Sequence, residues 1–236
     1  MTQGDTLMRI EAPILDRISL SGKTYRIIPS NYPPIALFES CLSPDDLEDI
    51  YELESLTNDR LKDEVGDLRR VPAEDRIAGP GTSAIMASFT HAGMPSRFTD
   101  GSYGVYYAGM DLKTAIAETK YWQEKQMRET NEPPFERTMR VYTASLHTGV
   151  GEFVDLSNDI RMHDPDNYTY SQGIAKDLRT LGEYGVYYNS IRNEGGNCIA
   201  AFRPKIINPT TQSMHLRYCW DGEKIFDVIE VKSSNA

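Results

Sequence analysis

The clearest folding signal in the chain is a helix that starts after residue 111 and stops before residue 131. Its apolar side chains follow the i, i+3, i+4, i+7 spacing of one helical face, with Leu112, Ala115, Ile116 and Thr119 on the stripe. Asp111 precedes the stripe in the position of an N-cap, and the stretch from Asn131 to Pro134 prevents the helix from continuing. This pattern predicts a helix that buries one face in a packed domain.

Short strand patterns surround this helix. The pentapeptide Tyr-Gly-Val-Tyr-Tyr occurs at 103–107 and again at 184–188, and we interpret the two copies as strands in similar environments. The remaining predicted elements are a short helix after Thr82-Ser83, strands at 137–146, 152–156 and 197–202, a helix at about 170–181, and a hairpin that joins 214–220 to 224–231 through Asp221-Gly222. Together they predict an α+β domain over 76–236, with a bent or split β-sheet core and flanking helices.

Residues 1–75 differ from the rest of the chain because they carry the densest acidic run, from Asp45 to Asp67, and little strand pattern. The stretch Ser43-Pro44-Asp45-Asp46 is typical of a helix start, with a capping hydroxyl, a first-turn proline and acidic residues at the positive end of the helix. We therefore predict an N-terminal helical arm over 1–75.

Charge limits the partners that this chain can have. The formal net charge of -10 repels phosphate backbones and anionic lipid surfaces, so direct nucleic-acid binding is not expected. No basic cluster followed by an apolar run stands at the start, and no stretch approaches the roughly 18 apolar residues of a membrane span. We expect a cytoplasmic protein without membrane contact, whose three cysteines are reduced and buried because no Cys-x-x-Cys spacing occurs.

The generic signatures of catalytic sites fail in this sequence. Gly22-Lys23-Thr24 resembles the end of a phosphate-binding loop, but Arg17 stands where its first glycine is required. No Gly-x-Gly-x-x-Gly follows a strand, and no Gly-x-Ser-x-Gly presents a nucleophilic serine. The oxygen-rich stretch 163–167 is ordinary turn chemistry, so no metal site is predicted.

One set of segments resembles a known family, the RES domain family, which is named for an arginine, a glutamate and a serine. The resemblance covers roughly 80–207 and is carried by Ser96-Arg97-Phe98, Gly104-Val105-Tyr106-Tyr107-Ala108, Thr114-Ala115-Ile116-Ala117-Glu118-Thr119, and Gly185-Val186-Tyr187-Tyr188-Asn189-Ser190-Ile191-Arg192 leading into Gly195-Gly196-Asn197-Cys198. This chain departs from the family pattern at Phe98 and Asn189, where members often have tryptophan and proline.

The resemblance implies a fold related to mono-ADP-ribosyltransferase toxins and NAD⁺ as the substrate, with no separate cofactor. It also implies a partner, an antitoxin with an Xre-like helix-turn-helix. Carried over by position, the arginine is Arg97, the glutamate is Glu118 and the serine is Ser190, and Tyr107 stands where similar proteins have an active-site tyrosine.

The chemistry of NAD⁺ cleavage explains why a site would need these residue types. Breaking the bond between ribose and nicotinamide develops positive charge on the sugar, which a nearby carboxylate stabilises, and Glu118 fits that role. An arginine fork holds the pyrophosphate, for which we expect Arg97 with Arg192 as a helper. We expect Tyr107 to face the nicotinamide or a ribose, and Ser190 to orient the nicotinamide amide or ribose rather than to act as a nucleophile.

Three functions stay open at this point. The leading hypothesis is a toxin that depletes NAD⁺ by hydrolysis or by phosphate attack. The second is an ADP-ribosyltransferase that modifies a particular protein through the same pocket. The third is a non-enzymatic binding module whose acidic arm recognises a basic partner. The sequence is also compatible with a homo-oligomer.

Overall fold

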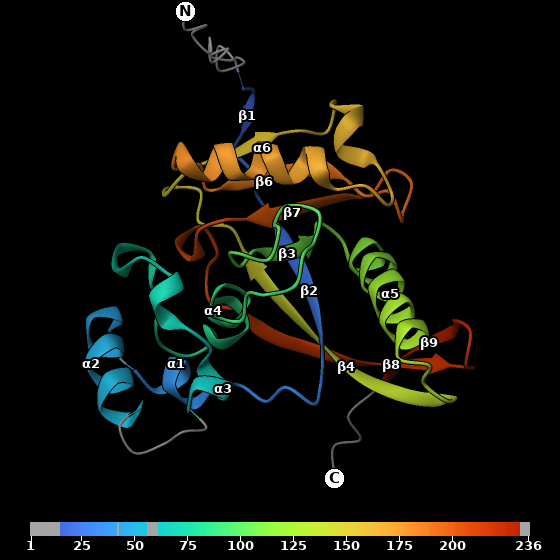
Figure 1. The fold of residues 1–236 in the computed structure, drawn as a ribbon, viewed down its shortest axis with the longest axis horizontal. Helices are drawn as coiled ribbons and strands as arrows, with labels where there is room; N and C mark the ends of the chain where they lie inside the picture. Colours follow the sequence, from blue (N-terminus) through green and yellow to red (C-terminus); the bar gives the residue numbers. More distant parts are fainter. Residues whose placement is uncertain (1–14, 42, 56–60, 232–236) are drawn as a thin grey trace, which may run out of the picture.

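A computed structural model describes residues 15–41, 43–55 and 61–231, which form one mixed β-sheet with helices packed around it (Figure 1). The strands are β1 (Arg17–Ile18), β2 (Lys23–Pro29), β3 (Tyr106–Gly109), β4 (Phe135–Ser145), β5 (Phe153–Asp155), β6 (Gly185–Asn189), β7 (Asn197–Ala201), β8 (Thr211–Trp220) and β9 (Ile225–Val231). The helices are α1 (Ala36–Ser40), α2 (Pro44–Ser55), α3 (Leu61–Val65), α4 (Ser83–Thr90), α5 (Leu112–Glu129) and α6 (Thr169–Thr180). Four 3₁₀ turns add η1 (Leu68–Arg70), η2 (Ala73–Asp75), η3 (Ile160–His163) and η4 (Pro204–Ile206).

The sheet has two halves that meet at a narrow joint. Its strand order is β1-β5-β6-β7-β3-β2-β4-β8-β9, and all neighbours are antiparallel except β5 and β6. The joint between β3 and β2 consists of one residue pair, Tyr25 with Gly109, whereas β2 and β4 pair over seven residues. The α+β class and the bent or split sheet are thereby confirmed.

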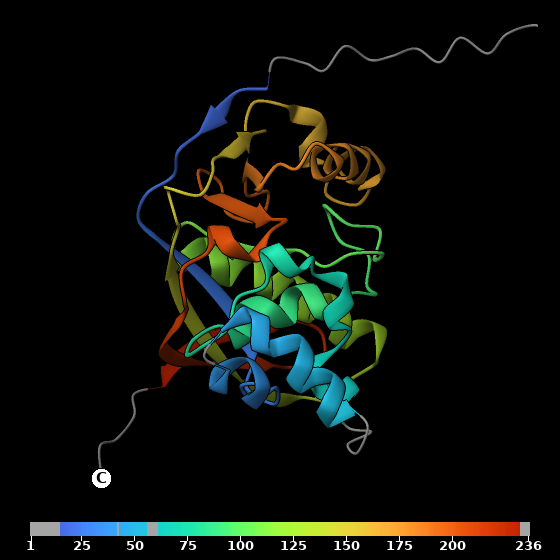
Figure 2. The same ribbon diagram turned by 90° about the vertical axis from the view of Figure 1, so that its left-hand side faces the viewer.

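Each half of the sheet has its own helical cover. Helix α6 packs Ala175 and Leu178 against β5, β6 and β7, and α5 packs Ala115 and Met127 against β2, β4 and β8. Helices α1, α2 and α4 share a third core with the other face of β3 and β7. Figure 2 shows α6 and the group of α1, α2 and α4 on separate parts of the molecule.

The predicted helix at 112 is confirmed together with its cap. Asp111 accepts a hydrogen bond from the Thr114 backbone N–H at 2.8 Å and ends the strand segment that precedes α5. The two Tyr-Gly-Val-Tyr-Tyr copies are neighbours of a single strand, because β3 and β6 pair on either side of β7. In the first copy the strand begins only at Tyr106, since Gly104 lies so close to the backbone of α4 that a Cβ atom would be 2.2 Å from the Ser88 carbonyl oxygen.

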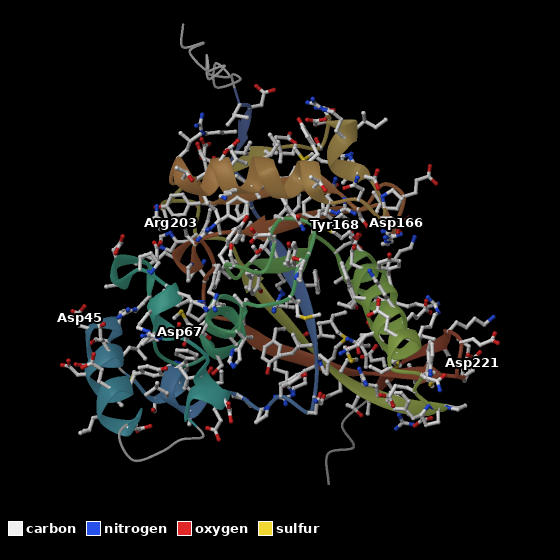
Figure 3. The ribbon with its side chains drawn as sticks, viewed as in Figure 1. Asp45, Asp67, Asp166, Tyr168, Arg203 and Asp221 are labelled. Carbon is white, nitrogen blue, oxygen red and sulfur yellow. The ribbon has the colours of Figure 1, made fainter. Side chains whose placement is uncertain are left out.

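The prediction of a helical arm over 1–75 is wrong in part, because this range also contains two strands of the sheet. Helices α1, α2 and α3 do lie in this range, and Figure 3 labels Asp45 in α2 and Asp67, which follows α3. However, residues 17–29 are not helical: β2 is an interior strand of the sheet, and β1 pairs with β5 at its edge. The range therefore contributes to the core, and its residues 1–14, 42 and 56–60 lie outside the described part of the chain.

The cysteine prediction is confirmed, since Cys41, Cys198 and Cys219 are buried and free. Burial raises the pKa of the Cys198 thiol well above its ordinary value. None of the helices in the described ranges combines the length and the apolar character that a membrane crossing requires.

Candidate active site

A cavity of about 650 Å³ lies between α5 and the joint of the two half-sheets. Four predicted site residues line it, namely Arg97, Tyr107, Glu118 and Arg192. Ser190 is buried directly behind Glu118. Thus residues that are spread from 97 to 192 in the sequence meet around one opening.

Glu118 is held in place by Ser190. The Ser190 hydroxyl donates to Glu118 Oε1 at 2.5 Å, and its Oγ accepts the backbone N–H groups of Arg192 and Asn193 at 3.1 Å each. A hydroxyl has one proton and two lone pairs, so this arrangement uses all three. The Ser190 oxygen therefore has no free lone pair for nucleophilic attack, and its contact fixes the carboxylate of Glu118 at the cavity wall.

Arg97 lines the cavity, and one of its guanidinium nitrogen atoms is hydrogen-bonded to the backbone. Nη1 donates to the carbonyl oxygens of Met162 and Asp164, at 2.5 and 2.9 Å, and the group lies over the Tyr168 ring at 4.7 Å. Within 15–41, 43–55 and 61–231, no carboxylate forms an ion pair with Arg97. Nε and Nη2 also have no hydrogen-bond partner in these ranges, which leaves two donors for an anion.

Tyr107 supports the arginine segment through its hydroxyl group. The hydroxyl oxygen accepts the Phe98 N–H at 3.0 Å and shares a 2.8 Å hydrogen bond with Ser96 Oγ, so it braces the residues on both sides of Arg97. Burial raises the pKa of Tyr107 far above its ordinary value, and the phenol stays neutral. As alternation along a strand requires, Tyr106 points to the opposite face and is fully buried.

Arg192 packs at the edge of the cavity. Its guanidinium carbon is 3.4 Å from the centre of the Tyr121 ring, and Nη2 donates to the Pro165 carbonyl oxygen at 3.0 Å. These contacts tie the loop after β6 both to α5 and to the loop before α6. Arg192 therefore closes one side of the opening.

Among the other residues that line the cavity, sequence reasoning missed Arg26, Trp122 and Tyr168. Arg26 donates from Nη1 to the Tyr107 carbonyl oxygen at 3.0 Å and lies over the Tyr106 ring at 4.8 Å. Burial lowers the pKa of its guanidinium, and among the described residues its Nε has no hydrogen-bond partner and no acid forms an ion pair with it. A strand arginine between Tyr25 and Ile27 carries no sequence signal for such a position.

Trp122 and Tyr168 bring an aromatic wall to the cavity. Their ring centres are 6.2 Å apart, and they reach the cavity from α5 and from the loop before α6. Figure 3 labels Tyr168 and Asp166 between α6 and α5. Flat rings of this kind pack well against a planar heteroaromatic group.

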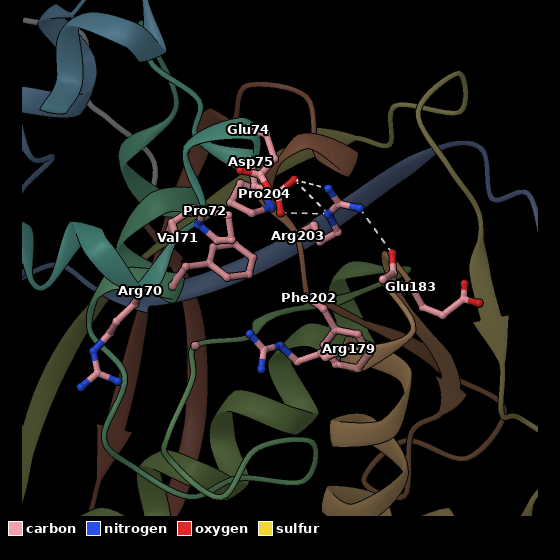
Figure 4. Close-up of a pocket in the computed structure, with 13 residues that line it drawn as sticks. Arg70, Val71, Pro72, Glu74, Asp75, Arg179, Glu183, Phe202, Arg203 and Pro204 are labelled. Atoms are coloured by element: carbon pink, nitrogen blue, oxygen red, sulfur yellow. Dashed lines mark hydrogen bonds and ion pairs between the residues drawn. The ribbon is translucent and has the colours of Figure 1, made fainter.

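A separate cavity of about 280 Å³ lies between η2 and the end of α6 (Figure 4). Arg203 points toward Asp75 there, and its Nε donates to both carboxylate oxygens at 2.9 Å. The Asp75 side chain is 7% exposed. This ion pair joins the N-terminal region to the segment between β7 and η4.

Comparisons with known proteins place the chain among its relatives. A family model described as "RES domain" matches residues 70–221, which is more than half of the chain and includes all the predicted site residues. The chain is 28% identical over 213 residues to the uncharacterized protein y4oC of Sinorhizobium fredii (strain NBRC 101917 / NGR234), which covers 89% of this chain and 88% of that protein. The crystal structure of the M. tuberculosis MbcT-MbcA toxin-antitoxin complex matches with a TM-score of 0.44 and 9% identity, over 92% of this chain and 87% of that chain.

Proposed function

The chain belongs to the RES domain family, and on that premise we propose that it is the toxin of a toxin-antitoxin pair and that it cleaves the nicotinamide-ribose bond of NAD⁺. The observation that carries the proposal is the carboxylate of Glu118, fixed by Ser190 at the wall of a cavity that also holds Arg97. The proposed partner is an antitoxin with an Xre-like helix-turn-helix.

Glu118 supplies the electrostatic part of the reaction. When the bond from the ribose carbon C1′ to the nicotinamide nitrogen breaks, its electron pair leaves with the neutral nicotinamide and the sugar becomes cationic. A carboxylate that is already oriented stabilises this charge without reorganising. Ser190 provides the orientation because its proton is directed at Glu118 Oε1.

Arg97 and Arg26 supply the binding part. Both guanidinium groups lie at the cavity without a carboxylate partner among the described residues. A pyrophosphate supplies the negative charge that these guanidinium groups are not paired with, and it accepts several hydrogen bonds at once. Trp122 and Tyr168 offer ring faces to the nicotinamide, and exclusion of water by this wall strengthens the interaction between Glu118 and the sugar.

The acceptor completes the reaction. In hydrolysis, water adds its oxygen to C1′ and releases a proton, which gives ADP-ribose. In phosphorolysis, inorganic phosphate adds one oxygen to the same carbon, which gives a phosphorylated ADP-ribose. In protein modification, a nucleophilic side chain of another protein bonds to C1′ and releases its proton, which gives an ADP-ribosylated protein.

The test is to identify the product that contains adenosine. Purified protein is incubated with NAD⁺, with and without phosphate and cell extract, and the products are separated by liquid chromatography and mass spectrometry. Free ADP-ribose or its phosphorylated form supports the proposal. ADP-ribose that is found attached to a protein replaces the proposal with ADP-ribosyl transfer. If no nicotinamide is released under any condition, the binding-module hypothesis remains.

A growth experiment tests the toxin assignment. Expression of the chain in bacteria is expected to lower cellular NAD⁺ and stop growth. Co-expression of the cognate antitoxin is expected to restore both. Growth arrest with unchanged NAD⁺ contradicts the proposed activity.

A further inference from the structure

A second cavity of about 780 Å³ adjoins the first. Its walls come mainly from the end of β2 and the segment that leads to α1, from α4 with the loop that follows it, and from Tyr142 of β4. Four residues line both cavities, namely Arg26, Met94, Ser96 and Tyr107. The two spaces therefore share a wall, and the cation of Arg26 lies in that wall.

The lining of the second cavity suits an uncharged aromatic group. Tyr32 and Tyr142 contribute rings, and Arg140 ties them together by donating to the Tyr32 carbonyl oxygen at 2.8 Å and to the Tyr142 hydroxyl at 3.2 Å. Asp63 and Glu64 bring negative charge to the same cavity, which disfavours a phosphate inside it. A flat base and a ribose satisfy this chemistry better than an anion does.

Size argues in the same direction. Small-molecule sites usually enclose roughly 300–1,000 Å³, and each of the two cavities falls within that range on its own. The nicotinamide riboside part occupies the first cavity if Glu118 acts on it, and the pyrophosphate is drawn to Arg97 in that cavity and to Arg26 at the shared wall. The other end of the dinucleotide then continues into the second cavity.

We propose that the second cavity is the binding site for the adenosine half of NAD⁺, with Arg26 at the crossing point between the two halves of the dinucleotide. This inference rests on the proposed function. It assigns the adenosine half of the substrate to a space formed largely by the N-terminal region and α4, away from the reacting bond.

The experiment compares two substrates that contain the same scissile bond. Nicotinamide mononucleotide lacks the adenosine part of NAD⁺, so it does not need the second cavity. Ala87, which lines this cavity from α4, is changed to phenylalanine to fill the space. Ala73→Phe serves as the matched control because Ala73 is exposed and lines neither cavity.

The expected result is a selective loss. Ala87→Phe lowers kcat/KM for NAD⁺ about tenfold, which corresponds to about 1.4 kcal/mol, and leaves kcat/KM for the mononucleotide unchanged. Ala73→Phe changes neither value. Equal losses for both substrates, or no loss for either, overturn the proposal.

A second variant and a binding measurement keep the test decisive. Tyr32→Ala removes an exposed ring at the rim of the cavity and is expected to weaken NAD⁺ turnover selectively, whereas Tyr32→Phe retains it. AMP binding is measured by calorimetry with the wild-type protein and with Ala87→Phe. If the wild-type protein releases no nicotinamide, the proposed function fails. The adenosine site still stands if Ala87→Phe weakens AMP binding about tenfold, and it falls if AMP binds both proteins equally or neither.

Discussion

Replacement of Glu118 by glutamine isolates the charge of one side chain. Glutamine keeps the shape and the carbonyl oxygen that Ser190 contacts at 2.5 Å, so the hydrogen bond and the fold are expected to persist. Two unit charges 4 Å apart interact by about 4 kcal/mol at an effective dielectric of about 20. If this stabilisation is present only in the transition state, its loss slows cleavage by about three orders of magnitude.

Single-turnover release of nicotinamide measures the effect directly. Glu194→Gln is the control, because Glu194 is an exposed glutamate in the loop that follows Ser190. Ser190→Ala is expected to cost roughly 10- to 100-fold, since hydrogen bonds to charged groups contribute about 1.5–3 kcal/mol. The double variant should be hardly slower than Glu118→Gln alone, because Ser190 acts through Glu118. A fall of less than about tenfold in Glu118→Gln, with a normal melting temperature, refutes the electrostatic reasoning.

Three further changes probe binding, bracing and stability. Arg97→Ala should raise the Kd for NAD⁺ at least about tenfold by calorimetry, because a charge-assisted contact to phosphate is lost, and an unchanged Kd contradicts its assignment. Tyr107→Phe leaves the N–H of Phe98 without its acceptor, so urea unfolding should show a loss of about 1 kcal/mol together with slower nicotinamide release; normal values for both exclude the bracing role. Asp75→Asn takes the charge partner from Arg203, and we expect about 2 kcal/mol less stability and a melting temperature about 4–8 °C lower at unchanged turnover; an unaltered melting temperature shows that the ion pair is not stabilising.

Local patterns predicted the local parts of this fold. The stripe from Leu112 and the cap at Asp111 gave α5, because both signals depend on neighbours within one or two helical turns. Strand β2 escaped prediction because it is interrupted by Arg26, and because its stability comes from pairing with β4, more than 100 residues away. Non-local pairing of this kind leaves little trace in a single sequence.

In the site, too, the residues could be predicted but their contacts with distant parts of the chain could not. The resemblance to a family grouped Arg97, Glu118 and Ser190, yet nothing in the sequence indicated that Ser190 donates to a carboxylate 72 residues away. Trp122 and Tyr168 look like ordinary packing residues on a helix and in a loop. They acquire a place at the cavity only because α5 and the segment before α6 meet in space.

Because a single residue pair, Tyr25 with Gly109, joins β2 to β3, the two halves of the sheet can bend relative to each other at this joint. The cavity that Glu118 lines spans that joint, with Arg26 of β2 on one side of it and Tyr107 of β3 on the other. A ligand that contacts both sides adds a link between two halves of the sheet that share only one strand pair. Amide hydrogen exchange along β2 and β3 should therefore slow in concert when the cavity fills, even at amides that touch no ligand atom.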